Sequence, residues 1–405
     1  MPEAGGALGR TGFPVLSQAE RQRRFAEVRT RMRERGVEAL VIRSDSSKWD
    51  SGSAEGRYLT QIGGNGEEGY TVFGLHDDPT FVIWGAGHIE NWLEIQDWTT
   101  DIRPSTPSAM RVVIGRLHEL EVARGVIALV GRAPSPLAAD GRWPYRAYEE
   151  LRRELSDARF VDFEAELAVA RSIKSAEEIA CHEKAMAIVE EAVAAMYRHA
   201  RPGVRATDLM GKVVGALVSA GSEMCVSVVV GASQRARMAA RVVPHRPLEA
   251  GDVILSEVTG KYAGYWSQAH VPVAVGGPPT ATHRRLFDVA LEGLRRGEAA
   301  LRPGITTLDL ARAIREPIGK AGHGSAILPP FKGIGLAITE IPLSPPVSAD
   351  PGGDYPVIRE NMILTLEPIA MDDEAKIGVH LAETFAVTSA GCRRLGRRDL
   401  TLVAT

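Results

Sequence analysis

The chain has 405 residues, of which 44% are hydrophobic and 24% charged, and its formal net charge at pH 7 is −3. A chain of this length predicts two or three domains with a core that needs no disulfide staples. The balanced charge argues against a nucleic-acid-binding protein. No apolar run approaches the roughly 20 residues that a membrane helix needs, so we expect a globular protein outside the membrane.

The N-terminus lacks the basic and apolar layout of a secretion signal. The three cysteines, Cys181, Cys225 and Cys392, show no paired spacing. Free thiols in a reducing compartment account for such a pattern better than a disulfide framework or a zinc knuckle. The sequence therefore predicts a cytoplasmic location.

The first part of the chain alternates predicted helices with predicted strands. Residues 20–36 predict a surface helix, because Phe25, Val28 and Met32 recur at helical spacing and Gly36 is a natural C-cap. Strands are predicted at 37–42, 70–75, 80–84 and 125–130, and further helices at 108–121 and 145–155. This alternation indicates a small α/β domain, which we place at residues 1–165.

A long helix with the capping box Ser175-x-x-Glu178 opens the second part of the chain, placed at residues 166–405. Helices are also predicted at 207–221, 281–301 and 306–321, and strands at 224–230, 252–258, 262–275, 362–367 and 378–387. Arg-Pro-Gly recurs at 201–203 and 302–304, each time between two predicted helices. The recurrence predicts a duplicated, pseudo-symmetric domain, and two unrelated helix-ending turns are the alternative.

Five polar side chains lie in or beside the late apolar strands: Glu257, Gln268, Lys332, Glu367 and Glu383. A carboxylate in an apolar strand is costly unless it is paired, hydrogen-bonded or bound to a ligand. A solvent-facing strand glutamate is the ordinary explanation for any one of them. The evidence for a functional site is therefore the order and spacing of the five residues as a set.

The segments around these positions resemble the M24 family, which comprises creatinase, aminopeptidase P, prolidase and methionine aminopeptidase. Residues 251–268 are similar to the family signature GD-hydrophobic-D-x-G-x-x-x-x-GY-x-x-D. Residues 331–342 resemble GHGIGL-x-x-HE-x-P, residues 361–368 resemble GM-x-x-T-x-EP, and Arg57-Tyr-Leu-Thr resembles the YLTG segment. The resemblance implies an α+β chain with a pita-bread C-terminal domain, a smaller α/β N-terminal domain and assembly as a homodimer.

This chain departs from the family pattern at the positions that bind the metal ions. Metallopeptidases of this family hold two divalent ions with Asp, Asp, His, Glu and Glu, and the resemblance places these ligands at Glu257, Gln268, Lys332, Glu367 and Glu383. Gln268 offers only a neutral carbonyl, and the ammonium of Lys332 has no lone pair to donate. We therefore expect neither a metal ion nor another cofactor. Three carboxylates and one ammonium leave a charge of −2, which suits a cationic substrate group.

Creatinase works without metal and is the nearest template. The resemblance places its guanidinium-holding carboxylate at Glu367 and a second substrate-binding carboxylate at His270. Its catalytic histidine falls on Ala240 and its carboxylate-gripping arginine on Thr339, so creatine itself is not expected as substrate. We expect His270 to transfer protons, because an ordinary pKa near 6.5 suits this task and nearby carboxylates would raise it. A structural histidine is the alternative.

These observations predict a metal-independent, creatinase-like enzyme that cleaves a C–N bond in a small polar metabolite, cationic or zwitterionic, by hydrolysis or elimination. Catalysis is assigned to His270, Glu367 and Lys332, and substrate binding to Glu257, Gln268, Glu383, Tyr265 and Thr339. Lys332 could instead be a counter-ion or a clamp for a substrate carboxylate, and His245 and His380 are expected to be structural.

Two other functions stay open. One is a non-catalytic pita-bread module that binds peptides or proteins. The other is an enzyme with one metal ion held by Glu257, Glu367 and Glu383, either a lyase or an Xaa-Pro peptidase.

Overall fold

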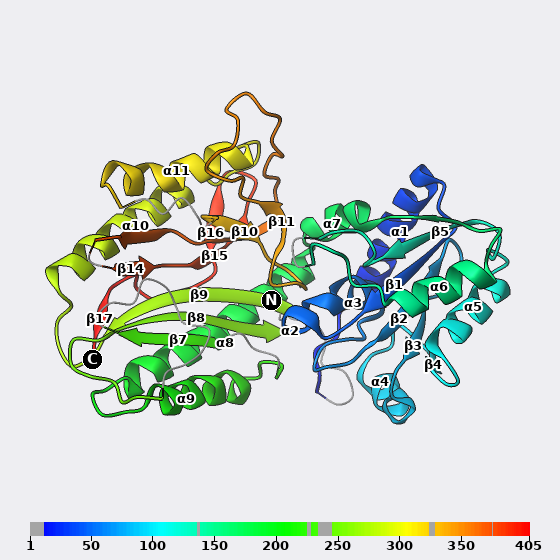
Figure 1. The fold of residues 1–405 in the computed structure, drawn as a ribbon, viewed down its shortest axis with the longest axis horizontal. Coiled ribbons are helices and arrows are strands. Elements are labelled where there is room, and N and C mark those ends of the chain that lie inside the picture. Colours follow the sequence, from blue (N-terminus) through cyan, green and yellow to red (C-terminus); the bar gives the residue numbers. More distant parts are fainter. Residues whose placement is uncertain (1–11, 136–137, 225–227, 234–244, 324–328, 375) are drawn as a thin grey trace. The chain divides into compact units, whose positions relative to one another are not determined.

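The computed structural model of the chain describes residues 12–135, 138–224, 228–233, 245–323, 329–374 and 376–405. Cys225, Ala240 and part of the strand predicted at 224–230 lie outside these ranges. The chain divides into two compact units, Met1–Glu177 with Leu336–Thr339, and Glu178–Gly335 with Glu340–Thr405 (Figure 1). Residue 165, the expected boundary, lies inside helix α7 (Glu164–Ser172), which belongs entirely to the first unit.

The first unit is built on a six-stranded mixed sheet in the order β4-β3-β2-β1-β5-β6. Its strands are β1 (Ala39–Ser44), β2 (Gly69–Gly74), β3 (Thr80–Ile83), β4 (Asp101–Pro104), β5 (Val126–Val130) and β6 (Arg159–Val161). Its helices, besides α7, are α1 (Gln18–Arg35), α2 (Ser47–Asp50), α3 (Ala54–Thr60), α4 (Ile89–Ile95), α5 (Ala109–Glu119) and α6 (Tyr145–Glu154).

Helices cover both faces of this sheet, because alternate strand residues point to opposite sides. Val41 and Val72 lie in one core cluster with apolar residues of α5 and α6. On the other face Phe73 meets Phe25 of α1, with ring centroids 5.0 Å apart. The distant segment Leu336–Thr339 joins this unit through the backbone N–H of Ile338, which donates to the Ser51 hydroxyl at 3.0 Å.

Within its described residues, the second unit contains two larger sheets and a two-stranded ribbon, in the orders β17-β9-β8-β7, β11-β10-β12-β15-β16 and β13-β14. The strands of the first sheet are β7 (Val228–Ser233), β8 (Val253–Tyr262), β9 (Tyr265–Ala274) and β17 (Val403–Ala404). The remaining strands are β10 (Phe331–Gly333), β11 (Glu340–Leu343), β12 (Ile363–Leu366), β13 (Ile369–Asp372), β14 (Ile377–His380), β15 (Glu383–Val387) and β16 (Cys392–Arg394).

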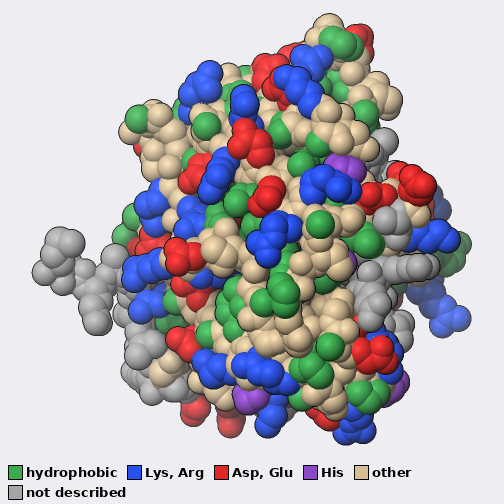
Figure 2. Space-filling model, turned by 90° about the vertical axis from the view of Figure 1, so that its left-hand side faces the viewer, with side chains coloured by type: hydrophobic (Ala, Val, Ile, Leu, Met, Phe, Trp, Pro, Cys, Tyr) green, Lys and Arg blue, Asp and Glu red, His purple; other side chains and the backbone are tan. Residues whose placement is uncertain are grey.

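In the part of this unit that the structure describes, four helices pack around these sheets: α8 (Ala176–His199), α9 (Ala206–Ser219), α10 (Ala281–Ala300) and α11 (Thr307–Lys320). The apolar side chains of α10 form a core cluster with Ala370 of β13 and Val379 of β14. Among the described residues, no helix is long and apolar enough to cross a membrane. On the face drawn in Figure 2, basic and acidic side chains are interspersed.

The predicted duplication has a counterpart in the hydrogen bonds of the second unit. Gly203 separates α8 from α9, Gly304 separates α10 from α11, and both glycines have a left-handed φ of 87°. The N–H of Gly203 donates to the carbonyl of Leu248 at 2.8 Å, and that of Gly304 donates to Ile358 at 2.9 Å. Each helix pair is therefore tied in the same way to a segment that precedes a strand.

Candidate active site

The candidate site lies where β9 of one sheet meets β15 of the other. The N–H of His270 donates to the carbonyl of Ala382 at 3.2 Å, and the N–H of Ala382 donates back at 3.3 Å. Beside this bridge the hydroxyl of Thr384 accepts from the N–H of Gln268 and donates to its carbonyl, at 3.1 and 3.0 Å. These contacts hold Gln268 and His270 of β9 next to Ala382 and Thr384.

The strand predicted at 378–387 is interrupted at this bridge, so that part of the prediction was wrong. It forms two strands, β14 and β15, in different sheets. The N–H of Leu381 bonds to the carbonyl of Pro368, while Ala382 pairs with His270 of β9. The break places His380 on one strand and Glu383 on the other.

Lys332 and Glu367 form an ion pair at this site. Lys332 on β10 pairs with Thr365 on β12, and Glu367 follows directly after β12. The ammonium of Lys332 lies 2.8 Å from Oε1 of Glu367, and the two side chains are 19% and 13% exposed. The ammonium thus binds one of the carboxylates that the family pattern assigns to metal.

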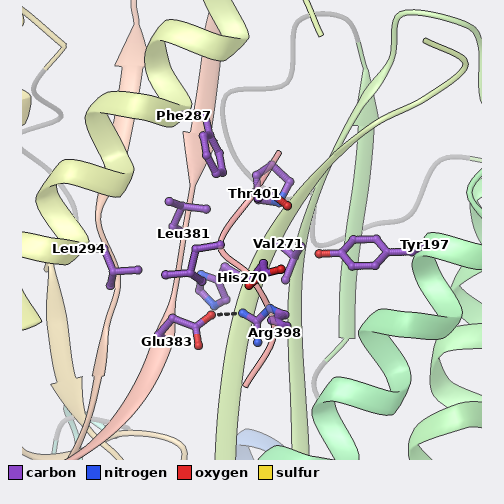
Figure 3. Close-up of a pocket in the computed structure, with 12 residues that line it drawn as sticks. Tyr197, His270, Val271, Phe287, Leu294, Leu381, Glu383, Arg398 and Thr401 are labelled. Atoms are coloured by element: carbon purple, nitrogen blue, oxygen red, sulfur yellow. Dashed lines mark hydrogen bonds and ion pairs between the residues drawn. The ribbon is translucent and has the colours of Figure 1, made fainter. Parts of the chain in front are cut away.

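Glu383 forms a second ion pair, with Arg398 of the C-terminal segment (Figure 3). Its side chain is 1% exposed and its Oε1 accepts from Nη2 of Arg398. Burial raises the pKa of Glu383 to about 7, although Arg398 and Arg394 act in the opposite direction. Sequence reasoning missed Arg398, because no motif marks it and only the folded chain brings it to Glu383.

His270 and His380 form a buried pair of rings. Their centroids are 4.1 Å apart at an interplanar angle of 73°, and Nδ1 of His270 lies 3.0 and 3.1 Å from the two ring nitrogens of His380. The amide nitrogen of Gln268 lies 2.5 Å from Nε2 of His270. In this arrangement the amide donates to Nε2, so the neutral His270 ring carries its proton on Nδ1.

The expected rise in the pKa of His270 was wrong in direction. Its pKa lies well below the usual value, first because the ring is buried and then because His380, Lys332 and Arg398 lie nearby. Burial and Lys332 also lower the pKa of His380 to about 3. Both imidazoles are therefore neutral near pH 7, so His270 can accept a proton but has none to give as an imidazolium.

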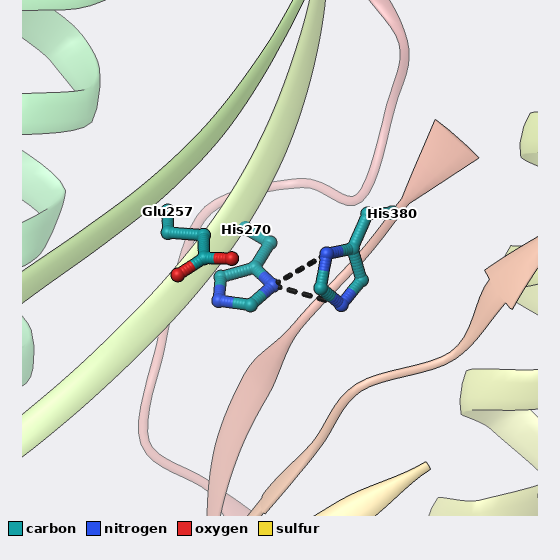
Figure 4. Close-up of side chains that lie close together, drawn as sticks. All are labelled: Glu257, His270 and His380. Atoms are coloured by element: carbon teal, nitrogen blue, oxygen red, sulfur yellow. Dashed lines mark hydrogen bonds between the residues drawn. The ribbon is translucent and has the colours of Figure 1, made fainter. Parts of the chain in front are cut away.

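Glu257 completes a cluster with these two histidines (Figure 4). It lies opposite His270 in the β8–β9 register, and one ligand atom from each of Glu257, His270 and His380 lies within 4.8 Å of the others. Two imidazoles and a carboxylate are a donor set suited to a divalent transition metal. His380, expected to be only structural, therefore belongs to the candidate site.

The five family ligand positions do not fit a dinuclear metal centre in this chain. Glu367 and Glu383 are each bound by a cationic side chain, and the amide nitrogen of Gln268 faces His270. With every group ionised, Glu257, Glu367 and Glu383 against Lys332 and Arg398 give a charge of −1, smaller in magnitude than the −2 expected from the sequence on the same basis. For one metal ion, the set Glu257, His270 and His380 fits better than the expected set of three glutamates.

Tyr265, predicted to bind substrate, lies away from the histidine cluster on the same strand. Tyr265 is five residues from His270 along β9, about 16 Å at the usual strand rise. It is 1% exposed, and its hydroxyl donates to Glu178 at 2.8 Å. Thr339 belongs to the segment Leu336–Thr339 of the first unit, whereas the rest of the set lies in the second. The structure therefore separates Tyr265 from the cluster and gives it a packing role.

Comparison with known proteins places both units in families. Metallopeptidase family M24 matches residues 180–389, and the creatinase/prolidase N-terminal domain matches residues 24–173. An Xaa-Pro dipeptidase from Pyrococcus furiosus is 26% identical over 269 residues, covering 66% of this chain and 75% of that protein. An uncharacterized hydrolase/peptidase from Sinorhizobium fredii is 28% identical over 399 residues, covering 95% of this chain and 96% of that protein.

Solved structures confirm the predicted fold. An X-Pro aminopeptidase from Thermotoga maritima superposes with a TM-score of 0.79 at 19% identity, covering 94% of this chain and 99% of that one. The prolidase from Pyrococcus horikoshii gives 0.75 at 21% identity, covering 94% and 100%. A small α/β N-terminal domain therefore precedes a pita-bread domain, as expected. With the match to more than half of its residues, the chain belongs to the metallopeptidase family M24.

Proposed function

We propose that this M24 protein is a hydrolase or lyase that cleaves a C–N bond of a small cationic or zwitterionic metabolite without the dinuclear metal centre of its family. The observation that carries the proposal is the ion pair of Lys332 with Glu367, 2.8 Å apart. It supplies a positive charge where the family pattern assigns a metal ligand. Preorganised charges in a closed site can lower a reaction barrier by stabilising charge that develops in the transition state.

The burial of the side chains suggests a role for each. Glu367 and Lys332 are partly exposed and can meet a substrate, whereas Glu383 is almost fully buried. Glu367 would hold a cationic or N–H-bearing group of the substrate. In hydrolysis, Nε2 of the neutral His270 would accept the proton of the attacking water once the amide of Gln268 has moved away from this nitrogen, and the ammonium of Lys332 would donate a proton to the leaving nitrogen. Gln268 would orient the imidazole.

The test is turnover measured together with metal content. Purified protein would be assayed, before and after EDTA treatment, with guanidino acids, ureido acids and Xaa-Pro dipeptides, with release of amine as the readout. We expect far less than one metal ion per chain and undiminished cleavage of a guanidino or ureido acid after chelation. Cleavage of Xaa-Pro dipeptides that is lost with EDTA and regained with Mn²⁺ would contradict the proposal.

A second candidate is a peptidase or lyase with one metal ion, favoured by the cluster of Glu257, His270 and His380 and by the similarity to Xaa-Pro dipeptidases. These three side chains would hold the ion, which would supply a Lewis acid. One equivalent of bound metal that is lost in His380→Ala and kept in Glu367→Gln would favour this candidate. Absence of turnover with every compound would favour a binding module.

A further inference from the structure

Two contacts hold the ring of His270, one at each of its nitrogens. The amide of Gln268 lies at Nε2, and the ring of His380 lies at Nδ1. In the proposed reaction the amide has to leave Nε2 before the attacking water can reach this nitrogen, and the contact with His380 then remains. We propose that His380 is a positioning residue, which accepts the Nδ1 proton of His270 and so keeps Nε2 free to act as the base. This role rests on the proposed function, because it serves the base of that reaction.

The geometry of the two rings suits an acceptor role for His380. Nδ1 of His270 lies 3.1 Å from Nδ1 of His380 and 3.0 Å from its Nε2. A neutral imidazole carries a lone pair on one nitrogen and a proton on the other. Because both nitrogens of His380 lie at hydrogen-bond distance, either tautomer of this ring brings its accepting nitrogen within reach of the Nδ1 proton of His270.

Burial makes this contact decisive for the tautomer of His270. The exposed fraction is 2% for His270 and 6% for His380, so bulk water does not compete for the Nδ1 proton. A buried donor that loses its acceptor pays the full cost of desolvation. With the amide of Gln268 displaced, the form of His270 that carries its proton on Nδ1 is therefore favoured by the acceptor on His380.

Paired strands hold the two histidines in place. His270 lies on β9, where its N–H and its carbonyl both bond to Ala382. His380 is the last residue of β14 and pairs with Ile369 of β13. Side chains on strands are positioned more precisely than side chains on loops. The contact between the rings can therefore persist when the side chain of Gln268 moves.

The pair has the logic of a histidine base that is oriented by a second group. In a Ser-His-Asp triad, a carboxylate at the other ring nitrogen fixes the tautomer and the orientation of the base, and stabilises the imidazolium that forms. A neutral imidazole can fix the tautomer in the same way, but it adds no negative charge. We therefore expect His380 to orient the ring of His270 without making it a stronger base.

The experiment removes the amide of Gln268 first and then asks what His380 does in its absence. The full-length proteins compared are Q268L, Q268L/H380F, Q268L/H380N and the control Q268L/H283F, each treated with EDTA. Phenylalanine keeps a ring but has no lone pair to accept a hydrogen bond, whereas asparagine offers a carbonyl oxygen. His283 is a matched control, because it is also 2% exposed and its ring contacts Thr280 at the start of α10 instead of His270.

The tautomer of His270 would be read from two-bond ¹H–¹⁵N correlation spectra of protein labelled with ¹⁵N-histidine. The signals of His270 are those that disappear in His270→Gln. We expect Q268L to keep the proton on Nδ1. In Q268L/H380F the ratio of the Nδ1–H form to the Nε2–H form should fall at least about fivefold, which corresponds to one net hydrogen bond. Q268L/H380N and Q268L/H283F should match Q268L.

Two results would overturn the role of His380. One is a proton on Nε2 of His270 in Q268L, and the other is an equal ratio of the two forms in Q268L and Q268L/H380F. Circular dichroism would check folding, and H380L replaces H380F if that variant does not fold. The spectra need no substrate, so the expected tautomers without cleavage of any compound would contradict the proposed function and not the contact between the two rings.

Discussion

The two ion pairs of the site differ in how much solvent reaches them. Lys332 and Glu367 are 19% and 13% exposed, whereas Arg398 and Glu383 are 13% and 1% exposed. A partly exposed pair can separate to admit a substrate group at modest cost, because water screens both charges. A buried pair cannot, because each charge depends on the other. The comparison assigns substrate contact to the first pair and a fixed electrostatic role to the second.

The largest effect is expected from Arg398→Ala, which leaves the buried carboxylate of Glu383 without its cation. We expect a loss of about 3–5 kcal/mol in the free energy of unfolding at pH 8, the usual range when one partner of a buried pair is removed. Urea unfolding would measure it. The control Arg393→Ala, which breaks an exposed pair, should change stability by no more than about 0.5 kcal/mol.

The pH dependence of this loss sharpens the result. Burial raises the pKa of Glu383 to about 7 even with Arg398 present, and removal of Arg398 would raise it further. The folded variant would then keep a proton that the unfolded chain has already released, so its stability falls as pH rises from 6 to 8. A loss that is equal at pH 6 and pH 8 would show that the carboxyl is not the group affected.

The next effect concerns catalysis by His270 and by Glu367 of the partly exposed ion pair with Lys332. We expect Glu367→Gln to lower turnover at least about 100-fold, because the neutral amide cannot hold a cationic substrate group. His270→Ala should have a similar effect, since it removes the proton acceptor. Steady-state kinetics with the substrate found in the screen would measure both. Wild-type rates in both variants would contradict the proposed mechanism. Glu292→Gln, at an exposed position of α10, is the control and should leave turnover unchanged.

The third effect tests the buried histidine pair. The pKa of His380 is about 3 in the folded protein and near 6.5 when unfolded, so the unfolded chain binds a proton first as the pH falls. Stability from this group is present above pH 6.5 and lost toward pH 3. Between pH 6.5 and 4.5, His380→Gln should lose about 2 kcal/mol less stability than the wild type. Exposed His199→Gln should lose as much as the wild type.

The fold and the positions of the candidate site residues along the chain could be predicted because their signals are local in sequence. Helical spacing and a glycine cap mark α1, and the repeated Arg-Pro-Gly marks two equivalent helix pairs. Motif order alone locates Glu257, Gln268, Lys332, Glu367 and Glu383 in the second unit. The ion pair of Lys332 with Glu367 is the outcome that opposite charges at matched positions predict.

The features that could not be predicted depend on contacts between distant segments. Arg398 reaches Glu383 because Glu190 of α8 holds its backbone, and nothing local in the sequence indicates this contact. His380 meets His270 because the strand breaks at Leu381 and Ala382, where the sequence has neither glycine nor proline to signal a break. The direction of the pKa shift of His270 depends on burial and on the neighbours His380, Lys332 and Arg398, all of which lower it.

The smallest effect is expected from Lys332→Met, and it decides whether the two pairs really differ. Because both side chains of this pair are partly exposed, we expect a loss of only about 1 kcal/mol in the free energy of unfolding. Lys320→Met, which breaks an exposed pair with Glu316 on α11, is the control and should cost no more than about 0.5 kcal/mol. A loss as large as that of Arg398→Ala would mean that Glu367 is as dependent on its cation as Glu383. The pair could then not open for a substrate, and the assignment of substrate contact to Glu367 would fail.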